Sequence, residues 1–143
     1  YINQATEISI VRTILHEMLH TYILSLVDDS TIPPGSIDIY NFPLLWNALV
    51  DNTYNNNPNL LHHEIISRHF IDPIKDALKE WDEGRQPDQY YDDLAWGALE
   101  ETSSFNTLFP VGSSDRDRIL DTNRAEDTNS NQNGINPKGS SCN

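Results

Sequence analysis

The chain has 143 residues, of which 37% are hydrophobic and 22% are charged, a composition that suits one folded domain and argues against wholesale disorder. Nine Lys and Arg residues against 22 Asp and Glu residues give a formal net charge of -13, which disfavours nucleic acid and anionic membranes as partners. The single cysteine, Cys142, excludes an intrachain disulfide framework and a multi-cysteine metal cluster. No apolar run is long enough for a transmembrane helix.

The first predicted helix covers 6–28, with Thr6 as its predicted N-cap. It begins almost at the start of the chain, and the residues before it form no targeting signal. We therefore expect a C-terminal piece of a longer protein. Few charges interrupt the helical pattern, so a wide face should be buried. Its apolar positions are Ile10, Val11, Ile14, Leu15, Met18, Leu19, Tyr22, Ile23 and Leu26.

The segment after this helix offers only short elements. A Pro-Pro-Gly breaker at 33–35 precedes a very short strand predicted over 37–40. A short helix is predicted over 44–50, and an Asn-rich loop over 51–59.

Three further helices are predicted in the second half of the chain. The first covers 60–81 and should kink or break near Asp72, because Pro73 follows. The others cover 90–101 and 114–127, the last one capped by Ser113 or Ser114. The predicted fold is mainly α with at most a vestigial strand pair: one domain over 1–127, then an irregular Asn/Ser/Gly-rich tail over 128–143.

The motif that carries chemistry is His16-Glu17-Met18-Leu19-His20, an HExxH pattern in the middle of the first helix. Residues four apart on a helix lie one turn above each other, so both imidazoles can bind the same Zn²⁺. Glu17 can then reach a zinc-activated water as general base. Leu15, Met18 and Leu19 should form a dry wall beside that water.

A catalytic zinc needs a third protein ligand. The helix over 60–81 carries His62, His63 and His69. Its apolar stripe consists of Ile66, Phe70, Ile74, Ala77 and Trp81. At about 100° per residue, His63 falls on the centre of the stripe and the other two fall on a flank that faces solvent or a loop. His63 is therefore the preferred third ligand.

Carboxylates remain as alternatives for the third position. Asp93-Leu94-Ala95-Trp96-Gly97 resembles the DxxYG stretch that holds the aspartate ligand of aspzincin proteases, with Trp in place of Tyr. The choice between His63 and Asp93 stays open. Glu100 or Glu101 could imitate a gluzincin ligand but are better explained as surface charges, and Glu64 lies too far from the centre of the stripe.

Several other residues have weaker functional interpretations. Tyr90 or Tyr91 could stabilise an oxyanion, and Arg68 could act as an electrophile or contact a ligand. The aromatic set is better explained as core, and consists of Trp46, Trp81, Tyr90, Tyr91, Trp96 and Phe105.

Taken together, the sequence resembles a zincin metallopeptidase, and within that class the SprT-like group. HEMLH matches the first-helix motif, and HHEIISRHF resembles the later segment that supplies a third histidine. The resemblance implies His16, His20 and His63 as zinc ligands and Glu17 as the catalytic acid/base. DQYYDDLAWGAL and the ending around Pro137 also resemble C-terminal toxin domains of large secreted bacterial proteins of the RHS type.

The expected function is zinc-dependent hydrolysis of peptide bonds in a protein or peptide substrate. The toxin-like resemblance implies secretion or delivery within a larger bacterial protein, and a cognate inhibitor or immunity protein. Zincins place a β-sheet before the HExxH helix, and this chain has only residues 1–5 there. We therefore expect either that the sheet lies upstream in the parent chain or that the fold is a minimal, helical version of a zincin. The alternative is a non-enzymatic acidic helical module with a structural or silent metal site, since 72–101 holds ten acidic and three basic residues.

Overall fold

Six helices make up most of residues 4–28 and 58–141, the parts of the chain that the computed structural model describes. They are α1 (Glu7–Asp28), α3 (Pro58–His69), α4 (Ile71–Trp81), α5 (Asp88–Ala95), α6 (Ser103–Leu108) and α7 (Ser114–Thr128). Within those residues there is no sheet, only the isolated bridges Thr6–Ser141 and Gln132–Ile135. The prediction of a mainly α fold is confirmed. The short elements predicted over 37–40, 44–50 and 51–59 lie outside the described residues.

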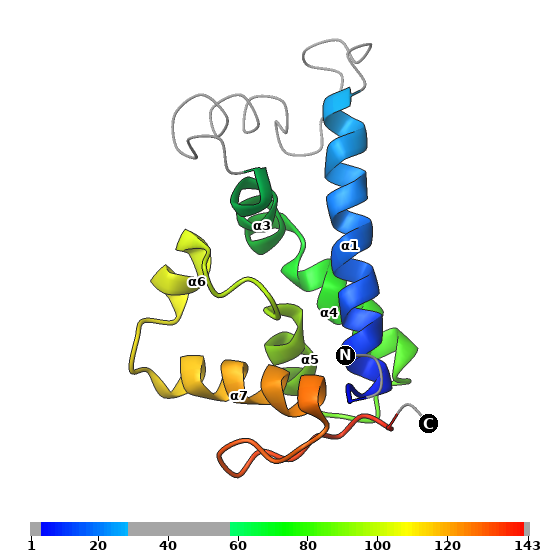
Figure 1. Cartoon of the computed structure of the whole chain (residues 1–143), viewed down its shortest axis with the longest axis vertical. Coiled ribbons are helices and arrows are strands. Elements are labelled where there is room, and N and C mark those ends of the chain that lie inside the picture. Colours follow the sequence, from blue (N-terminus) through cyan, green and yellow to red (C-terminus); the bar gives the residue numbers. More distant parts are fainter. Residues whose placement is uncertain (1–3, 29–57, 142–143) are drawn as a thin grey trace.

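α1 runs along the long axis of the molecule, and the other helices lie mainly to one side of it in the view of Figure 1. α5 lies between α4 and α7, and all three contact α1, while α6 reaches across to α3. None of the helices in the described ranges is long and apolar enough to cross a membrane. The core between them contains Ile8, Ile23, Ile65, Ile66, Ile74, Leu78, Tyr90, Tyr91, Leu94, Leu99, Phe105 and Ile119.

α1 begins where the sequence predicts, but its buried face is narrower than predicted. The Thr6 hydroxyl accepts a hydrogen bond from the Ser9 amide at 3.4 Å, as an N-cap does. Ile14, Met18 and Tyr22, however, form a row at a spacing of four residues and are 53%, 61% and 41% exposed. The wide buried face is therefore wrong on this side of the helix, and Met18 is no part of a dry wall.

The predicted break in the helix over 60–81 is confirmed, two residues earlier than expected. Phe70 separates α3 from α4, with φ -121° and ψ 5°. Pro73 has no amide hydrogen to donate to the His69 carbonyl, and its ring crowds that carbonyl, so α3 ends at His69. Trp81, at the end of α4, is 43% exposed, so its predicted place in the core is wrong.

The helix predicted over 90–101 forms only in its first half. α5 ends at Ala95, and the chain turns through Ala98, which adopts φ +63°. Gly97 sits so close to its neighbours that an added Cβ would lie 2.5 Å from Asn123 Oδ1 and 2.8 Å from Arg12 Cδ. The short α6, missed from the sequence, follows; the Thr102 side chain accepts from the Phe105 amide and caps it.

The last predicted helix is confirmed, and Ser113 is its cap: the Ser113 side chain accepts from the Arg116 amide. Asn129 ends α7 in the left-handed region at φ 47°. The residues that follow contain no helix up to 141, yet they return to α1, where the Glu7 amide donates to the Ser140 carbonyl at 2.9 Å. The division into a domain over 1–127 and a tail over 128–143 stays a prediction.

Glu64 joins α3 to the start of α6 through a fully buried carboxylate. It accepts from the Ser103 and Ser104 amides at 2.8 and 3.2 Å, from both serine hydroxyls, and from the Arg68 Nε at 3.1 Å. Burial alone would raise the pKa of Glu64, but the hydrogen bonds from Ser103, Ser104 and Arg68 outweigh it and hold the pKa below its ordinary value. The carboxylate is therefore a structural clamp.

Replacing this clamp should cost stability in a pH-dependent way. We expect Glu64→Gln to lower the free energy of unfolding by about 1–3 kcal/mol at pH 7, because hydrogen bonds to a charged acceptor are lost. Since the folded-state pKa is depressed, this contribution is present above the ordinary value of 4.5 and is lost as the pH falls through the folded-state value. Urea unfolding of both proteins between pH 7 and pH 3 should show the gap closing below pH 4.5. The exposed Glu80→Gln serves as the control, and a gap that is constant over this range would contradict the expectation.

Candidate metal centre

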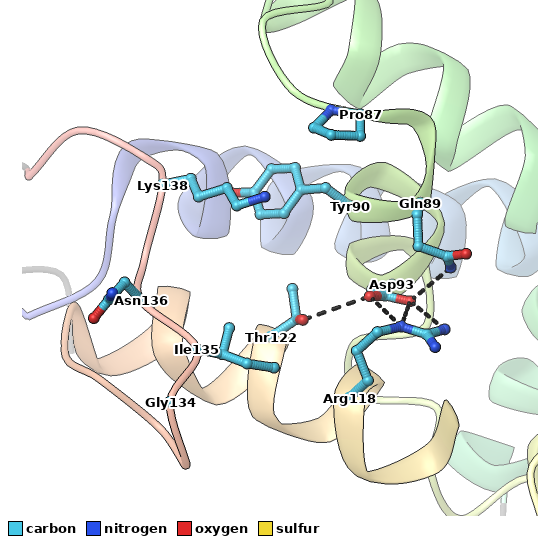
Figure 2. A pocket seen from close by; sticks show the side chains of 10 residues that line it. All are labelled: Pro87, Gln89, Tyr90, Asp93, Arg118, Thr122, Gly134, Ile135, Asn136 and Lys138. Atoms are coloured by element: carbon cyan, nitrogen blue, oxygen red, sulfur yellow. Dashed lines mark hydrogen bonds and ion pairs between the residues drawn. The ribbon is translucent and has the colours of Figure 1, made fainter. Parts of the chain in front are cut away.

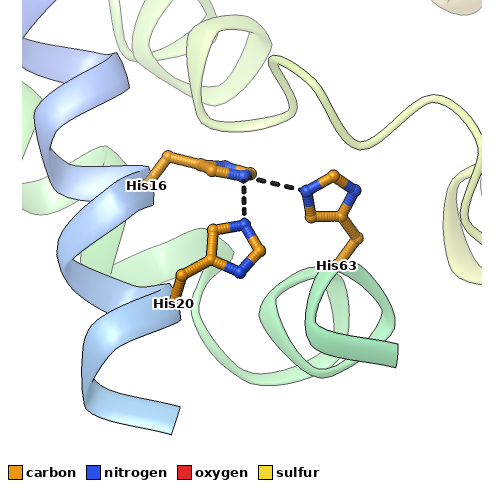
Figure 3. A group of neighbouring side chains, drawn as sticks. All are labelled: His16, His20 and His63. Atoms are coloured by element: carbon orange, nitrogen blue, oxygen red, sulfur yellow. Dashed lines mark hydrogen bonds between the residues drawn. The ribbon is translucent and has the colours of Figure 1, made fainter. Parts of the chain in front are cut away.

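Three histidines from two helices meet beside the middle of α1. His16 and His20 project from one face of α1, and His63 projects toward them from α3 (Figure 3). The His16 Nε2 lies 3.0 Å from the His20 Nε2 and 3.1 Å from the His63 Nε2. One nitrogen from each ring lies within 4.8 Å of the other two. The structure thus brings together the three residues predicted as ligands.

Two of the three nitrogen–nitrogen separations in this cluster are close to those around a tetrahedral ion, and the third, between His20 and His63, is within 4.8 Å. Zinc–nitrogen bonds of about 2.0–2.1 Å at tetrahedral angles place ligand nitrogens about 3.3 Å apart. The distances from His16 Nε2 to the other two nitrogens, 3.0 and 3.1 Å, are slightly shorter. Three histidine nitrogens would leave the fourth position of a tetrahedral ion for water or substrate, as in catalytic zinc sites.

Hydrogen bonds between the three rings cannot by themselves satisfy all the ring nitrogens of the cluster. The His63 Nδ1 is paired with the Glu101 carboxylate, an acceptor, so a neutral His63 ring keeps a bare lone pair on Nε2. One proton on His16 Nε2 can point at only one of its two neighbours, so the other short contact is left without a well-directed hydrogen bond. A cation among the three nitrogens could instead be bound by all three rings. The donor set therefore fits a metal ion.

Electrostatics also prepare the rings for a metal. Burial, and then the neighbouring His20, His63 and Arg12, lower the pKa of His16 to about 3. Burial and His63 likewise lower the pKa of His20, against a smaller opposing effect of Glu17. At neutral pH these two imidazoles are uncharged and offer lone pairs without first releasing a proton.

His62 and Glu101 also belong to this neighbourhood. The sequence placed His62 on a flank facing solvent or a loop, and it favoured a surface charge over a metal ligand for Glu101. His62 is 4% exposed, and its Nδ1 lies 3.0 Å from the His20 Nδ1, so its predicted solvent-facing position is wrong. α3 packs against α1, which buries the flank that the helical periodicity assigned to solvent or a loop. Glu101 is exposed as predicted for a surface charge, but its carboxylate pairs with the His63 Nδ1.

Asp93, the alternative third ligand, is bound elsewhere. It is 3% exposed and accepts from the Arg118 Nε at 3.0 Å and from Gln89 at 3.1 Å, between α5 and α7 (Figure 2). A pocket of about 420 Å³ opens beside this pair, lined also by Tyr90 and Lys138. The carboxylate is thus engaged by a guanidinium, whereas the His63 imidazole faces the other two histidines.

The remaining candidates are occupied by structural contacts. The Tyr90 hydroxyl donates to Glu126 at 2.7 Å and the Tyr91 hydroxyl donates to Asp82 at 2.6 Å, both within the core. Burial is the main cause that raises the pKa of each phenol, so both stay protonated. Arg68 pairs with Glu64 on its own helix. Neither tyrosine nor Arg68 belongs to the cluster that could hold a metal, which consists of three histidines.

Glu17 lies on the exposed side of α1, next to His16 in the chain. Its charge is close enough to His20 to oppose the lowering of that pKa. The motif thus presents two imidazoles toward α3 and a solvent-accessible carboxylate beside them.

Comparisons of the chain with protein-family models, with curated proteins and with solved structures found no match.

Proposed function

We propose that this chain is a zinc-dependent metallopeptidase in which His16, His20 and His63 hold the ion and Glu17 acts as general base. The observation that carries the proposal is the meeting of three histidine nitrogens, two from an HExxH helix and one from a distant helix, within 4.8 Å. The SprT-like resemblance, the substrate class of proteins or peptides, and delivery within a larger bacterial protein belong to the same proposal.

In this proposal the chain's own residues divide the work. Bound zinc would supply Lewis-acid chemistry, which brings the pKa of a water toward neutrality and polarises the scissile carbonyl. Glu17 accepts a proton from the attacking water and later returns a proton to the leaving amine. The three histidines would hold the ion. The lowered pKa values of His16 and His20 keep those two rings neutral at pH 7, with lone pairs available for it.

The first test is the metal itself. Protein purified without added zinc should contain about one zinc per chain by mass spectrometry of the metal. Removing the zinc with a chelator should lower the melting temperature, and adding zinc should restore it. Absence of bound metal, with no rise in melting temperature on adding zinc, would rule out the proposal.

Glu17→Gln should separate metal binding from chemistry. We expect the variant to retain one zinc per chain and to cleave a library of internally quenched fluorogenic peptides at least about a hundred-fold more slowly, because the base is lost. Glu7→Gln, which removes another exposed glutamate of α1, is the matched control. Equal cleavage by Glu17→Gln and the parent chain would show that Glu17 is not the base.

The same assays address the alternative function. A parent chain that binds zinc tightly but cleaves no peptide in the library would favour an acidic interaction module with a structural metal. The salt bridges Lys75–Asp92 and Lys79–Asp88 engage two cations of the acidic segment. Both pairs lie at the solvent-accessible surface, where ion pairs contribute little to stability, so the segment is equally suited to a solvated surface.

A further inference from the structure

Two of the three clustered histidines carry a second contact on the ring nitrogen that faces away from the cluster. The His63 Nδ1 pairs with the Glu101 carboxylate. The His20 Nδ1 lies 3.0 Å from the His62 Nδ1. Both contacts leave Nε2, the nitrogen that meets the other rings, unobstructed.

We propose that Glu101 and His62 are positioning residues of the metal centre, which hold His63 and His20 with Nε2 directed at the ion and thereby strengthen zinc binding. This inference rests on the zinc site of the proposed function. It does not depend on whether the bound metal hydrolyses peptides.

Glu101 fixes both the tautomer and the orientation of His63. An ionised carboxylate can only accept, so the His63 Nδ1 must carry the proton, and Nε2 keeps the lone pair that a metal needs. The Glu101 side chain is 49% exposed and the His63 side chain 16%, so the carboxylate holds the ring from its solvent side. A negative charge at this position also makes the imidazole a stronger donor to a metal.

His62 performs the corresponding task for His20 from within the protein. A His20 ring that binds a metal through Nε2 carries its proton on Nδ1, and the His62 Nδ1 is placed to accept it. His62 and His63 are consecutive on α3, and a helix turns successive side chains by about 100°. One therefore reaches His20 from behind while the other enters the cluster, which gives the HH pair in the sequence a physical reason.

The experiment measures zinc affinity by competition with a chromophoric chelator in the full chain. Glu101→Ala and His62→Leu should each weaken the dissociation constant about 10- to 100-fold. Glu101→Gln and His62→Asn retain an acceptor and should lie closer to the parent. Glu100→Ala, which removes the neighbouring exposed charge, should stay within about two-fold.

A second readout separates positioning from a merely structural role. In the metal-free parent at pH 8, long-range ¹H–¹⁵N spectra should show His63 and His20 each protonated at Nδ1. Glu101→Ala should redistribute the His63 tautomer, and His62→Leu the His20 tautomer. Far-UV circular dichroism checks folding, and if His62→Leu fails to fold, His62→Asn should show a reproducible intermediate affinity and tautomer population.

Each assignment can fail by itself. A zinc affinity within two-fold of the parent in Glu101→Ala, or in His62→Leu, would overturn the role of that residue. An equal loss in Glu100→Ala would overturn the role of Glu101, since total charge would then be the cause. If the zinc-loaded parent cleaves no peptide, the proposed peptidase activity is overturned. The zinc affinities of the variants would still test whether Glu101 and His62 position the metal ligands.

Discussion

Replacing His63 with alanine should weaken zinc binding more than about a hundred-fold, beyond the effect typical of residues that only orient a ligand. Among the described residues, His63 offers one of the three clustered nitrogens, so its loss would leave two ligands on a single helix. Asp93→Asn should leave zinc affinity within about two-fold, because the Asp93 carboxylate is bound by Arg118. Measuring the zinc affinity of both variants by competition with a chelator checks these two expectations.

The two variants decide directly between the alternatives that the sequence left open. Asp93→Asn disturbs a partly buried ion pair and should lower the melting temperature, so affinities are compared at a temperature where both variants are folded. His69→Ala, which changes another histidine of the same helix, is the control for His63→Ala. Loss of zinc from Asp93→Asn with retention in His63→Ala would reverse the ligand assignment.

Glu126→Ala should lower the free energy of unfolding by about 3 kcal/mol or more, because four donors lose their acceptor in a buried site. The Glu126 carboxylate is 1% exposed. It accepts from the Thr6 and Tyr90 hydroxyls at 2.6 and 2.7 Å and from the Lys138 and Gly139 amides at 2.6 and 3.2 Å. It thus ties the start of α1, α5 and the chain after α7 to one point.

Thermal unfolding should show this loss as a fall of about 10 °C or more in the melting temperature of Glu126→Ala. Glu83→Ala, at an exposed turn, is the control and should change the melting temperature little. Gly139→Ala should act in the same direction, since an added Cβ would lie 2.8 Å from both Ile8 and Thr6. An unchanged melting temperature in Glu126→Ala would mean that these hydrogen bonds add nothing to the free energy of unfolding.

The sequence predicted the helices whose signals are local. The period of apolar residues located α1, the cap at Ser113 located α7, and Pro73 located the break between α3 and α4. α6 was not predicted, because a helix of six residues is too short to show a recognisable period of apolar residues. The end of α5 was missed because it depends on Gly97 packing against Arg12 and Asn123, contacts between residues far apart in the chain.

The candidate site divides in the same way. His16 and His20 follow from a spacing of four on one helix, and His63 followed from its place on the apolar stripe of another. His62 and Glu101 could not be placed, since their neighbours are set by how α3 lies against α1 and where the turn after α5 leads. A signal for His62 was present in the doubled histidine, but periodicity alone assigned that flank to solvent.

The bridge between Thr6 and Ser141 has a consequence for how the protein can be handled. The two described ends of the chain lie side by side at the foot of α1, while His16 and His20 lie two to four turns further along that helix (Figure 1). A surface tether or a fluorescent reporter attached near either end would therefore approach from the same pole and leave the histidine cluster accessible. Joining those ends and opening the chain at the exposed turn around Gly84 should yield a circular permutant that still assembles the cluster.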